Sequence, residues 1–146
     1  MMDLFDDRYV QYTDQPDLSW KDAVRTAGTP LLKDELIAPE YIDNIIQTCL
    51  DAGSYMNIGP DIVLAHARPL PSTKKASMAL LFSKHPVSLL DDEAHKARLW
   101  IFMATPDSDS HIELIQKLAA LLMDSEFLEK VCAVNSREEL LQVLHS

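Results

Sequence analysis

The chain has 146 residues, of which 47% are hydrophobic and 25% are charged, and these values are typical of a single globular domain spanning residues 1–146. Its net charge of -10 argues against nucleic acid as a partner, because binding nucleic acid depends on cationic side chains that neutralise phosphates. The same charge disfavours anionic membrane surfaces and is compatible with steering toward a basic protein surface.

The N-terminal segment Met1–Asp7 lacks the basic start and the apolar run of a signal peptide. No apolar stretch approaches the roughly 20 residues needed to cross a bilayer. The chain contains no internal repeat and no Gly/Ser-rich linker that would divide it. We therefore expect an undivided, cytoplasmic protein.

Two helices are predicted in the first third of the chain. Ser19 is a suitable N-cap for the first helix, and Pro30 should kink or split it, because proline lacks the backbone N–H that a helix interior needs. The second helix should begin at Ala38–Glu40, where Pro39 suits the first turn, and should stop at Gly53. Their apolar faces consist of Trp20, Ala23, Val24, Ala27 and Leu31, and of Ile42, Ile45, Ile46 and Cys49.

The middle of the chain changes from helical spacing to short strand-like segments separated by turns. Two of these segments, Ile62–Ala65 and Leu99–Ala104, are continuous apolar runs, which suit central strands covered on both faces. The predicted strands are Tyr55–Ile58, Ile62–Ala67, Ser77–Phe82 and Leu99–Ala104.

The last third returns to helical spacing. Ser136–Glu139 matches a capping box that would open the final helix. Helices before and after a strand-rich middle predict a sheet that lies between helices. The predicted apolar stripes are Ile112, Ile115, Ala119 and Leu122, then Phe127, Leu128 and Val131, and finally Leu140, Leu141 and Leu144.

Among the five histidines, His66 has the setting best suited to chemistry. It follows a buried-looking strand, and an alanine on each side leaves its ring unobstructed. If the chain stays extended, Arg68 projects to the same face. A neutral imidazole nitrogen can attack phosphorus while a guanidinium holds the phosphoryl oxygens. The alternative is a core histidine satisfied by ordinary hydrogen bonds, with Arg68 solvated.

His111 has the second informative setting. Ser110–Glu113 matches a capping box with Ser110 as N-cap, so His111 would be the first helical residue. A helix start offers free backbone N–H groups and a positive dipole end, which favour a bound anion and a neutral ring. The alternative is a surface histidine on a first turn. His85, His95 and His145 are interpreted as surface residues.

Other kinds of site have little support in the sequence. A metal site would need a third ligand beside His66 and His111 at a recognisable spacing, and none stands out. Cys49 and Cys132 have no CxxC partner and are interpreted as small buried hydrophobic residues. A glycine-rich phosphate loop, a nucleophile elbow and a dinucleotide fingerprint are also missing. We expect no metal and no cofactor.

Two segments of the sequence resemble the mannitol/fructose/ascorbate-type EIIA domains of the phosphoenolpyruvate-dependent sugar phosphotransferase system. Ile62–Pro69 is similar to the family segment around its phosphorylated histidine, and the ending His-Ala-Arg-Pro is similar to the ascorbate-type branch in particular. His111–Leu118 is similar to a second family segment, whose histidine lies beside the first. The resemblance runs from about Trp20 to Leu144.

The resemblance implies a three-layer α/β/α sandwich with a mixed sheet. It also implies that His66 accepts phosphate from the histidine of phospho-HPr, at Nε2, and passes it to a cysteine of an EIIB partner, while His111 braces the phosphoryl group. The membrane would be reached only indirectly, through the EIIC component that mainly determines the sugar. An ascorbate-like sugar is favoured by the His-Ala-Arg-Pro match alone, and mannitol, fructose and galactitol stay open.

Three departures from the family pattern matter. Ala65 stands where a proline is usual. Asp61 stands where a glycine is usual, so that glycine is either replaced or displaced, and Gly59 is close by. The arginine that mannitol-type members carry on the preceding helix is missing from Thr48–Asp51, and we hypothesise that Arg68 supplies its charge. Two other interpretations stay open: a regulatory protein read through its phosphorylation state, and a non-catalytic protein whose histidines are structural.

Overall fold

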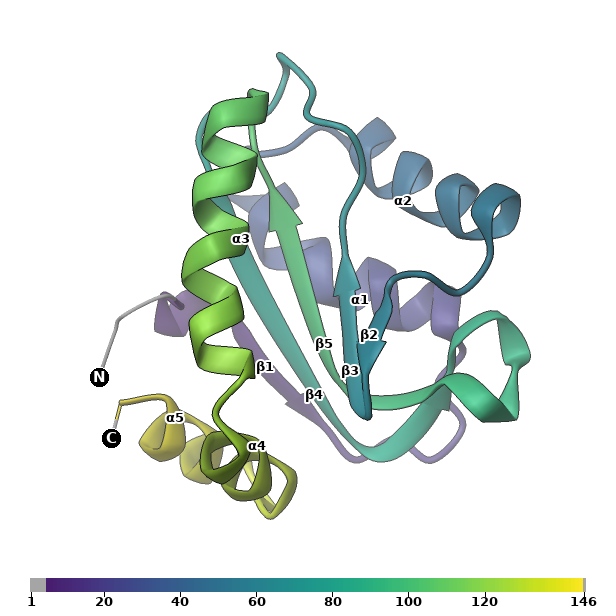
Figure 1. Ribbon diagram of the computed structural model, residues 1–146, viewed down its shortest axis with the longest axis vertical. Helices are drawn as coiled ribbons and strands as arrows, with labels where there is room; N and C mark the ends of the chain where they lie inside the picture. The colour runs from purple at the N-terminus through teal and green to yellow at the C-terminus, as the bar shows by residue number, and fades with distance from the viewer. Residues whose placement is uncertain (1–4, 146) are drawn as a thin grey trace.

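The apolar strand segments form one five-stranded sheet in the computed structural model, which describes residues 5–145 (Figure 1). Its order is β1-β4-β5-β3-β2, with the long strands β4 and β5 in the interior. The strands are β1 (Val10–Thr13), β2 (Asn57–Gly59), β3 (Asp61–Ala65), β4 (Ser77–Ser88) and β5 (Lys96–Ala104).

The sheet is mixed, as the resemblance implied. β1 pairs with β4 and β3 with β5 in parallel, while β4 pairs with β5 and β2 with β3 in antiparallel. The two apolar runs of the sequence are therefore neighbours, with Ala65 opposite Phe102. Because β3 and β5 are parallel, both end at the same edge of the sheet, and the chain leaves both strands there.

Helices cover both faces of the sheet and complete a three-layer sandwich. Figure 1 shows α1 and α2 behind the sheet and α3 in front of it, with α4 and α5 below α3. No helix within residues 5–145 has the length and apolar character needed to cross a membrane. The helices are α1 (Trp20–Lys33), α2 (Pro39–Ala52), α3 (Ser108–Leu122), α4 (Ser125–Cys132) and α5 (Arg137–His145).

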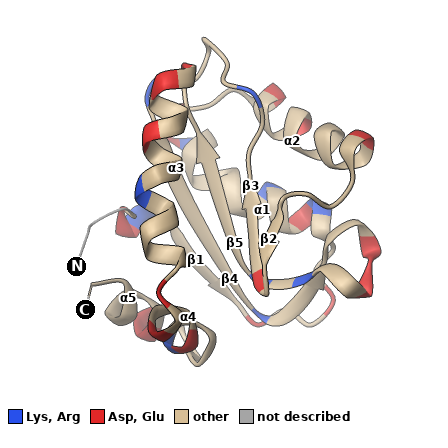
Figure 2. Cartoon of the chain, in the orientation of Figure 1, with Lys and Arg blue, Asp and Glu red and all other residues tan. Residues whose placement is uncertain are grey.

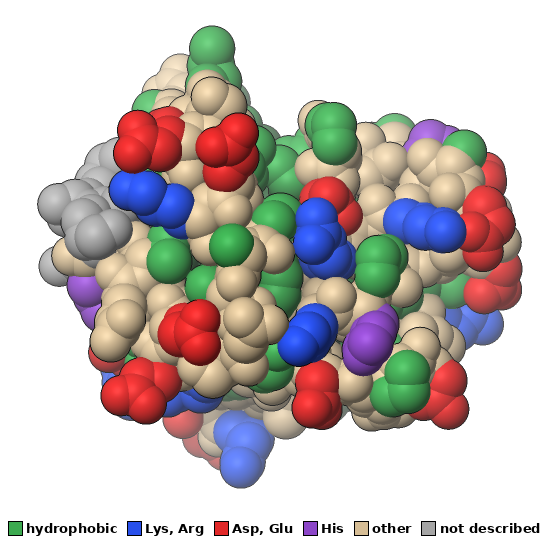
Figure 3. Space-filling model, turned by 90° about the horizontal axis from the view of Figure 1, so that it is seen from below, with side chains coloured by type: hydrophobic (Ala, Val, Ile, Leu, Met, Phe, Trp, Pro, Cys, Tyr) green, Lys and Arg blue, Asp and Glu red, His purple; other side chains and the backbone are tan. Residues whose placement is uncertain are grey.

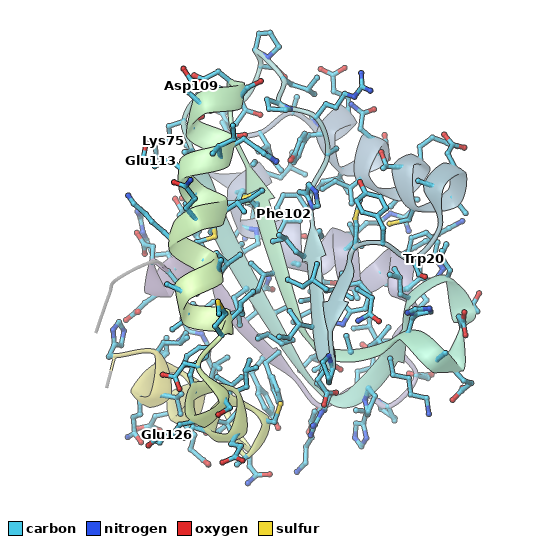
Figure 4. The ribbon with its side chains drawn as sticks, viewed as in Figure 1. Trp20, Lys75, Phe102, Asp109, Glu113 and Glu126 are labelled. Atoms are coloured by element: carbon cyan, nitrogen blue, oxygen red, sulfur yellow. The ribbon has the colours of Figure 1, made fainter. Side chains whose placement is uncertain are left out.

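Each face of the sheet has its own apolar core, and β5 contributes to both. Trp100 and Phe102 pack with α1 and α2 on one side, whereas Ile101 and Met103 pack with α3, α4 and α5 on the other. Phe102 is labelled near the middle of the sheet in Figure 4. Successive side chains of a strand point to opposite faces, so a strand covered on both faces has to be apolar throughout. This explains the uninterrupted run Leu99–Ala104.

The helix α1 continues through Pro30 to Lys33, so the predicted split is wrong. Proline cannot donate a hydrogen bond to the carbonyl four residues earlier, which belongs to Thr26. The side chain of Gln11 in β1 donates to this carbonyl instead, at 2.6 Å from Nε2. The lost helical bond is therefore replaced from the neighbouring strand, only one turn before the helix ends.

The apolar stripe predicted for α3 is wrong at two of its positions. Ile112 is 55% exposed and Ala119 is also exposed, whereas Leu118 and Leu121 are buried. The sequence also contains a second apolar stripe in this helix, which consists of Leu114, Leu118 and Leu121. This second stripe packs on the sheet. Ser136 is confirmed as the residue that caps the start of α5, since the backbone N–H of Glu139 donates to Ser136 Oγ at 3.1 Å. The carboxylate of Glu139 accepts from the backbone N–H of Asn135 at 3.4 Å.

Candidate functional site

His66 and His111 lie side by side at the edge where β3 and β5 end. β3 ends at Ala65, directly before His66, and β5 ends at Ala104, shortly before α3, whose first turn carries His111. The centroids of the two imidazole rings are 5.7 Å apart, and the ring planes are tilted by 46°. Two residues far apart in the sequence thus meet because their strands are parallel neighbours in the sheet.

The ring of His66 has one nitrogen held by the backbone. Its Nδ1 lies 2.8 Å from the carbonyl oxygen of Leu64. A carbonyl oxygen can only accept, so Nδ1 carries the proton and the lone pair of the neutral ring is on Nε2. The ring of Tyr55 meets the half-buried His66 ring edge-on, at 6.0 Å between centroids. The arrangement presents Nε2 as the nucleophilic atom.

The surroundings of His111 favour its neutral form. Burial lowers its pKa below the usual 6.5, and the positive charge that His66 carries when protonated lowers it further. Its Nδ1 lies 3.4 Å from the hydroxyl of Thr105, which is fully buried. A neutral imidazole at this position can accept or donate one hydrogen bond without repelling a protonated neighbour.

The helix start predicted at His111 is wrong, because α3 begins earlier, at Ser108. The N-cap is Asp107, whose carboxylate accepts from the backbone N–H of Ser110 at 2.8 Å. The hydroxyl of Ser110 donates to the same carboxylate at 2.9 Å, and the two hydrogen bonds lower the pKa of Asp107. The backbone N–H of His111 is itself bonded to the carbonyl of Asp107. His111 therefore offers no free backbone N–H, and a carboxylate already occupies the positive end of the helix. Figure 4 shows Asp109 at this same end.

A shallow groove of about 710 Å³ runs past both rings. One wall is the segment that follows β3, including Arg68, and the other is a polar face of α2. Tyr55 lies between these walls along the chain and also lines the groove. The residues that α2 contributes are Asn44, Gln47, Thr48, Asp51 and Ala52.

Arg68 lines this groove together with the two histidines, but not for the reason that the sequence suggested. β3 ends at Ala65 and the chain bends at Arg68, so the strand does not continue to Arg68 as expected. Within residues 5–145 the exposed guanidinium has no hydrogen-bonding or ionic partner, and no other Lys or Arg lines the groove. Figure 2 shows a basic band on the segment after β3, facing acidic bands on α2 and at the start of α3.

The sequence model of a known family matches residues 3–146, and its description is "Phosphoenolpyruvate-dependent sugar phosphotransferase system, EIIA 2". The chain belongs to this EIIA family. The match covers nearly the whole sequence, including both histidine-bearing segments. The resemblance found in the sequence is thereby confirmed.

Two curated relatives of this EIIA domain carry different sugar names. One is the mannitol-specific cryptic phosphotransferase enzyme IIA component of Escherichia coli, 29% identical over 125 residues, which are 86% of this chain and 84% of the relative. The other is the ascorbate-specific EIIA component of Shigella dysenteriae, 27% identical over 127 residues, with coverage of 86% and 82%. Such similar identities do not separate the two sugars.

Solved structures show the same fold. The solution structure of the mannitol-specific cryptic enzyme IIA from Escherichia coli has a TM-score of 0.84 at 26% identity and covers 97% of this EIIA chain and 95% of its own. The complex of enzyme IIAMTL with phosphorylated enzyme IIBMTL from Escherichia coli has a TM-score of 0.73 at 22% identity, with 94% of each chain covered. The predicted α/β/α architecture is confirmed.

Some groove residues of the EIIA domain were not singled out from the sequence. Asn44, Gln47, Thr48 and Asp51 follow helical spacing, so a polar stripe opposite the apolar one could have revealed them. Tyr55 was expected inside a strand, but it precedes β2.

Within residues 5–145 no three His, Cys, Asp or Glu side chains come together as a metal site would require. Of the two cysteines, Cys49 is fully buried and Cys132 is half-buried.

Proposed function

We propose that this EIIA domain is a cytoplasmic phosphocarrier that accepts phosphate from phospho-HPr on His66 and passes it to a cysteine of an EIIB protein or domain. The observation that carries the proposal is the state of the His66 ring. Its Nδ1 is hydrogen-bonded to the backbone carbonyl of Leu64, and the ring lines an open groove. The centroid of this ring lies 5.7 Å from that of the His111 ring. A nucleophilic nitrogen with a fixed orientation and a neutral neighbour is what such a carrier needs.

In the first transfer, Nε2 of His66 attacks the phosphorus of the donor phosphohistidine. The bond from phosphorus to the donor nitrogen breaks, and that nitrogen leaves with the electron pair. The ring of His66 gains positive charge as the new bond forms, and the carbonyl of Leu64 at Nδ1 stabilises it. In the second transfer, a cysteine thiolate attacks the phosphorus and His66 leaves as the neutral imidazole.

His111 and Arg68 stabilise the phosphoryl oxygens in this proposal. If the hydroxyl of Thr105 donates to Nδ1 of His111, the ring proton is on Nε2 and can be donated to a phosphoryl oxygen. Arg68 adds a positive charge in a groove that otherwise lacks Lys and Arg. The attraction between Arg68 and the phosphoryl group has to outweigh the repulsion from a net charge of -10. Salt screens charges over about 10 Å, so the more distant acidic residues contribute little to that repulsion.

Phosphorylation with labelled phosphoenolpyruvate, enzyme I and HPr tests the role of His66. We expect label on the wild-type protein and none on His66→Ala. His85→Ala is the matched control, because His85 is an exposed histidine on β4, outside the groove. Label that persists in His66→Ala would overturn the proposal.

Arg68→Ala tests the charge in the groove. Loss of a charge-assisted contact to the phosphoryl group should slow phosphorylation by about 10- to 100-fold. Arg25→Ala removes an exposed arginine of α1 and should leave the rate unchanged. Thr48→Arg in the Arg68→Ala background places a guanidinium on the facing wall and should restore part of the rate. An unchanged rate in Arg68→Ala removes this residue from the mechanism.

The acceptor is tested by onward transfer. The solved complex of a structurally similar enzyme IIA with a phosphorylated enzyme IIB supports an EIIB partner for this chain. Label should move from His66 to EIIB of an ascorbate-type system, the sugar class that we favour from the His-Ala-Arg-Pro segment. EIIB of mannitol, fructose and galactitol systems serves for comparison. Phosphorylation without transfer to any of them would favour a regulatory role.

A further inference from the structure

Tyr41 of α2 has a buried hydroxyl that joins two other parts of the chain. The hydroxyl donates to the carbonyl oxygen of Met103 at 2.7 Å and accepts from the backbone N–H of Ala67 at 3.1 Å. Tyr41 is fully buried, and its ring meets the ring of Phe102 edge-on, at 5.9 Å between centroids. Burial raises the pKa of Tyr41 to about 12, so the hydroxyl keeps its proton under ordinary conditions.

The two partners of this hydroxyl belong to the two segments that carry the histidines. Ala67 directly follows His66, in the segment where β3 has already ended. Met103 lies near the end of β5, shortly before Thr105, whose hydroxyl contacts His111. A single oxygen atom therefore connects the chain beside one ring with the chain that leads to the other.

We infer that Tyr41 is a positioning residue, whose hydroxyl fixes the separation and orientation of His66 and His111. This inference rests on the proposed function, in which both rings act on one phosphoryl group. Ala67 lies outside any strand, so sheet pairing does not fix its N–H, and the Tyr41 oxygen is its acceptor. Without that oxygen, a buried N–H would lose its acceptor and the segment would move to find another.

Tyr41→Phe isolates the hydroxyl, because it leaves the packed ring in place. Tyr9→Phe is the matched control: Tyr9 is also buried, its hydroxyl donates to Asp34 at 2.7 Å, and it lies outside the groove. Tyr9→Phe loses the hydrogen bond to Asp34, whereas Tyr41→Phe loses one hydrogen bond to each of the two segments that carry the histidines. Only Tyr41→Phe should disturb the two rings.

The main readout is the kinetics of His66 phosphorylation by phospho-HPr. We expect Tyr41→Phe to lower kcat by about 10- to 100-fold, because a small misplacement of reacting groups has effects of this size. KM should stay near the wild-type value, because Tyr41 is fully buried and cannot touch a docked protein. Tyr9→Phe should keep wild-type values for both. Equal kcat in the two variants would overturn the inference.

A second measurement needs no destabilised variant. With 3-fluorotyrosine at position 41, the fluorine NMR signal should shift when His66 is phosphorylated, while the same probe at position 9 should not respond. An unchanged signal at position 41 would also overturn the inference. Failure of the proposed function looks different, because the wild-type protein would then take up no label on His66.

Discussion

The charge of a protonated His66 affects the titration of its neighbour His111, and this effect can be measured on a single residue. Protonated His66 lowers the pKa of His111, after burial as the larger cause. The unfolded chain therefore binds more protons at this position than the folded chain does. The stability associated with His111 is present above pH 6.5 and is lost as the pH falls through its lower folded-state pKa.

Removing one ring should therefore change the titration of the other. In His66→Ala we expect the pKa of His111 to rise toward its usual value, with the part due to burial remaining. Imidazole proton shifts followed by NMR over pH 4–8 give this pKa directly. His85→Ala should leave it in place, and an unmoved pKa in His66→Ala would contradict the ring contact.

Asp61 stands where a glycine is usual in the family, and the structure indicates why glycine suits this position. Its φ is 65°, in the left-handed region that favours glycine. Its carboxylate accepts two hydrogen bonds from Arg98, at 3.0 and 2.8 Å, and these compensate for the backbone strain. Ala65, in place of a proline, pairs with Phe102 and continues the parallel ladder up to His66.

Asp61→Ala and Asp61→Gly separate strain from the ion pair. Both variants lose the contact with Arg98, but only alanine keeps a Cβ in the left-handed conformation. We expect Asp61→Gly to be more stable than Asp61→Ala by about 1 kcal/mol, measured by urea denaturation. Equal stabilities would mean that the backbone relaxes out of this conformation in the variants.

At the scale of the element, the start of α3 determines where His111 lies. Asp107 satisfies the backbone N–H of Ser110, one residue before His111. Asp124 does the same for the start of α4, accepting from the N–H groups of Glu126 and Phe127, outside the groove. Both helices therefore begin at an aspartate N-cap, and only the cap of α3 is followed closely by a histidine of the groove.

Replacing each cap tests whether the first turn of α3 supports the chemistry. Asp107→Ala and Asp124→Ala should each cost about 1 kcal/mol of stability. Only Asp107→Ala should also slow phosphorylation of His66, because it loosens the turn that holds His111. Asp107→Asn keeps a good cap without the charge and should keep the rate. A slow Asp107→Asn would instead assign the effect to the carboxylate.

The elements with strong periodicity were predictable from the sequence, and those that depend on partners were not. α1, α2 and the cores of β3 and β5 were expected close to where they lie. β1 was missed, because a short edge strand with Gln11 and Thr13 has no apolar run and exists through pairing with β4. β4 extends beyond Phe82 to Ser88, but the exposed residues Lys84–Pro86 interrupt its apolar pattern before the buried Val87.

The candidate site was only partly predictable, because it too depends on which elements are neighbours in the fold. The proximity of His66 and His111 came from the family resemblance, since periodicity does not say that β3 and β5 are neighbours. The helix start beside His111 was misplaced, because Ser110 and Asp107 both suit an N-cap and only packing decides between them. Tyr41 lies within an apolar face, where a hydroxyl bonded to two distant segments leaves no trace in the sequence.

For the molecule as a whole, charge is the dominant feature, with 23 acidic and 13 basic residues. Figure 3 shows acidic and basic side chains intermixed on the face seen from below, the end away from the groove. Most of the ion pairs join exposed side chains, such as Lys130 with Glu126, and such pairs contribute little to stability. Repulsion among the excess acids should therefore outweigh them.

Salt should consequently stabilise the protein. Raising NaCl from 20 to 300 mM should screen this repulsion and add about 1 kcal/mol of stability, which corresponds to a rise in Tm of roughly 2–4 °C. Differential scanning calorimetry measures the change, and potassium chloride serves as a control for ion-specific effects. A fall in Tm would mean that attractive pairs dominate instead.

The hydrogen bond from His66 to Leu64 also has a kinetic consequence under the proposed function. With Nδ1 engaged, a single nitrogen faces a single groove, so a donor protein and an acceptor protein have to use the same opening. They cannot be bound together, and each transfer must finish before the next partner arrives. Initial rates should then follow a double-displacement pattern, with parallel lines in double-reciprocal plots. Intersecting lines would reveal a ternary complex, which one shared opening does not allow.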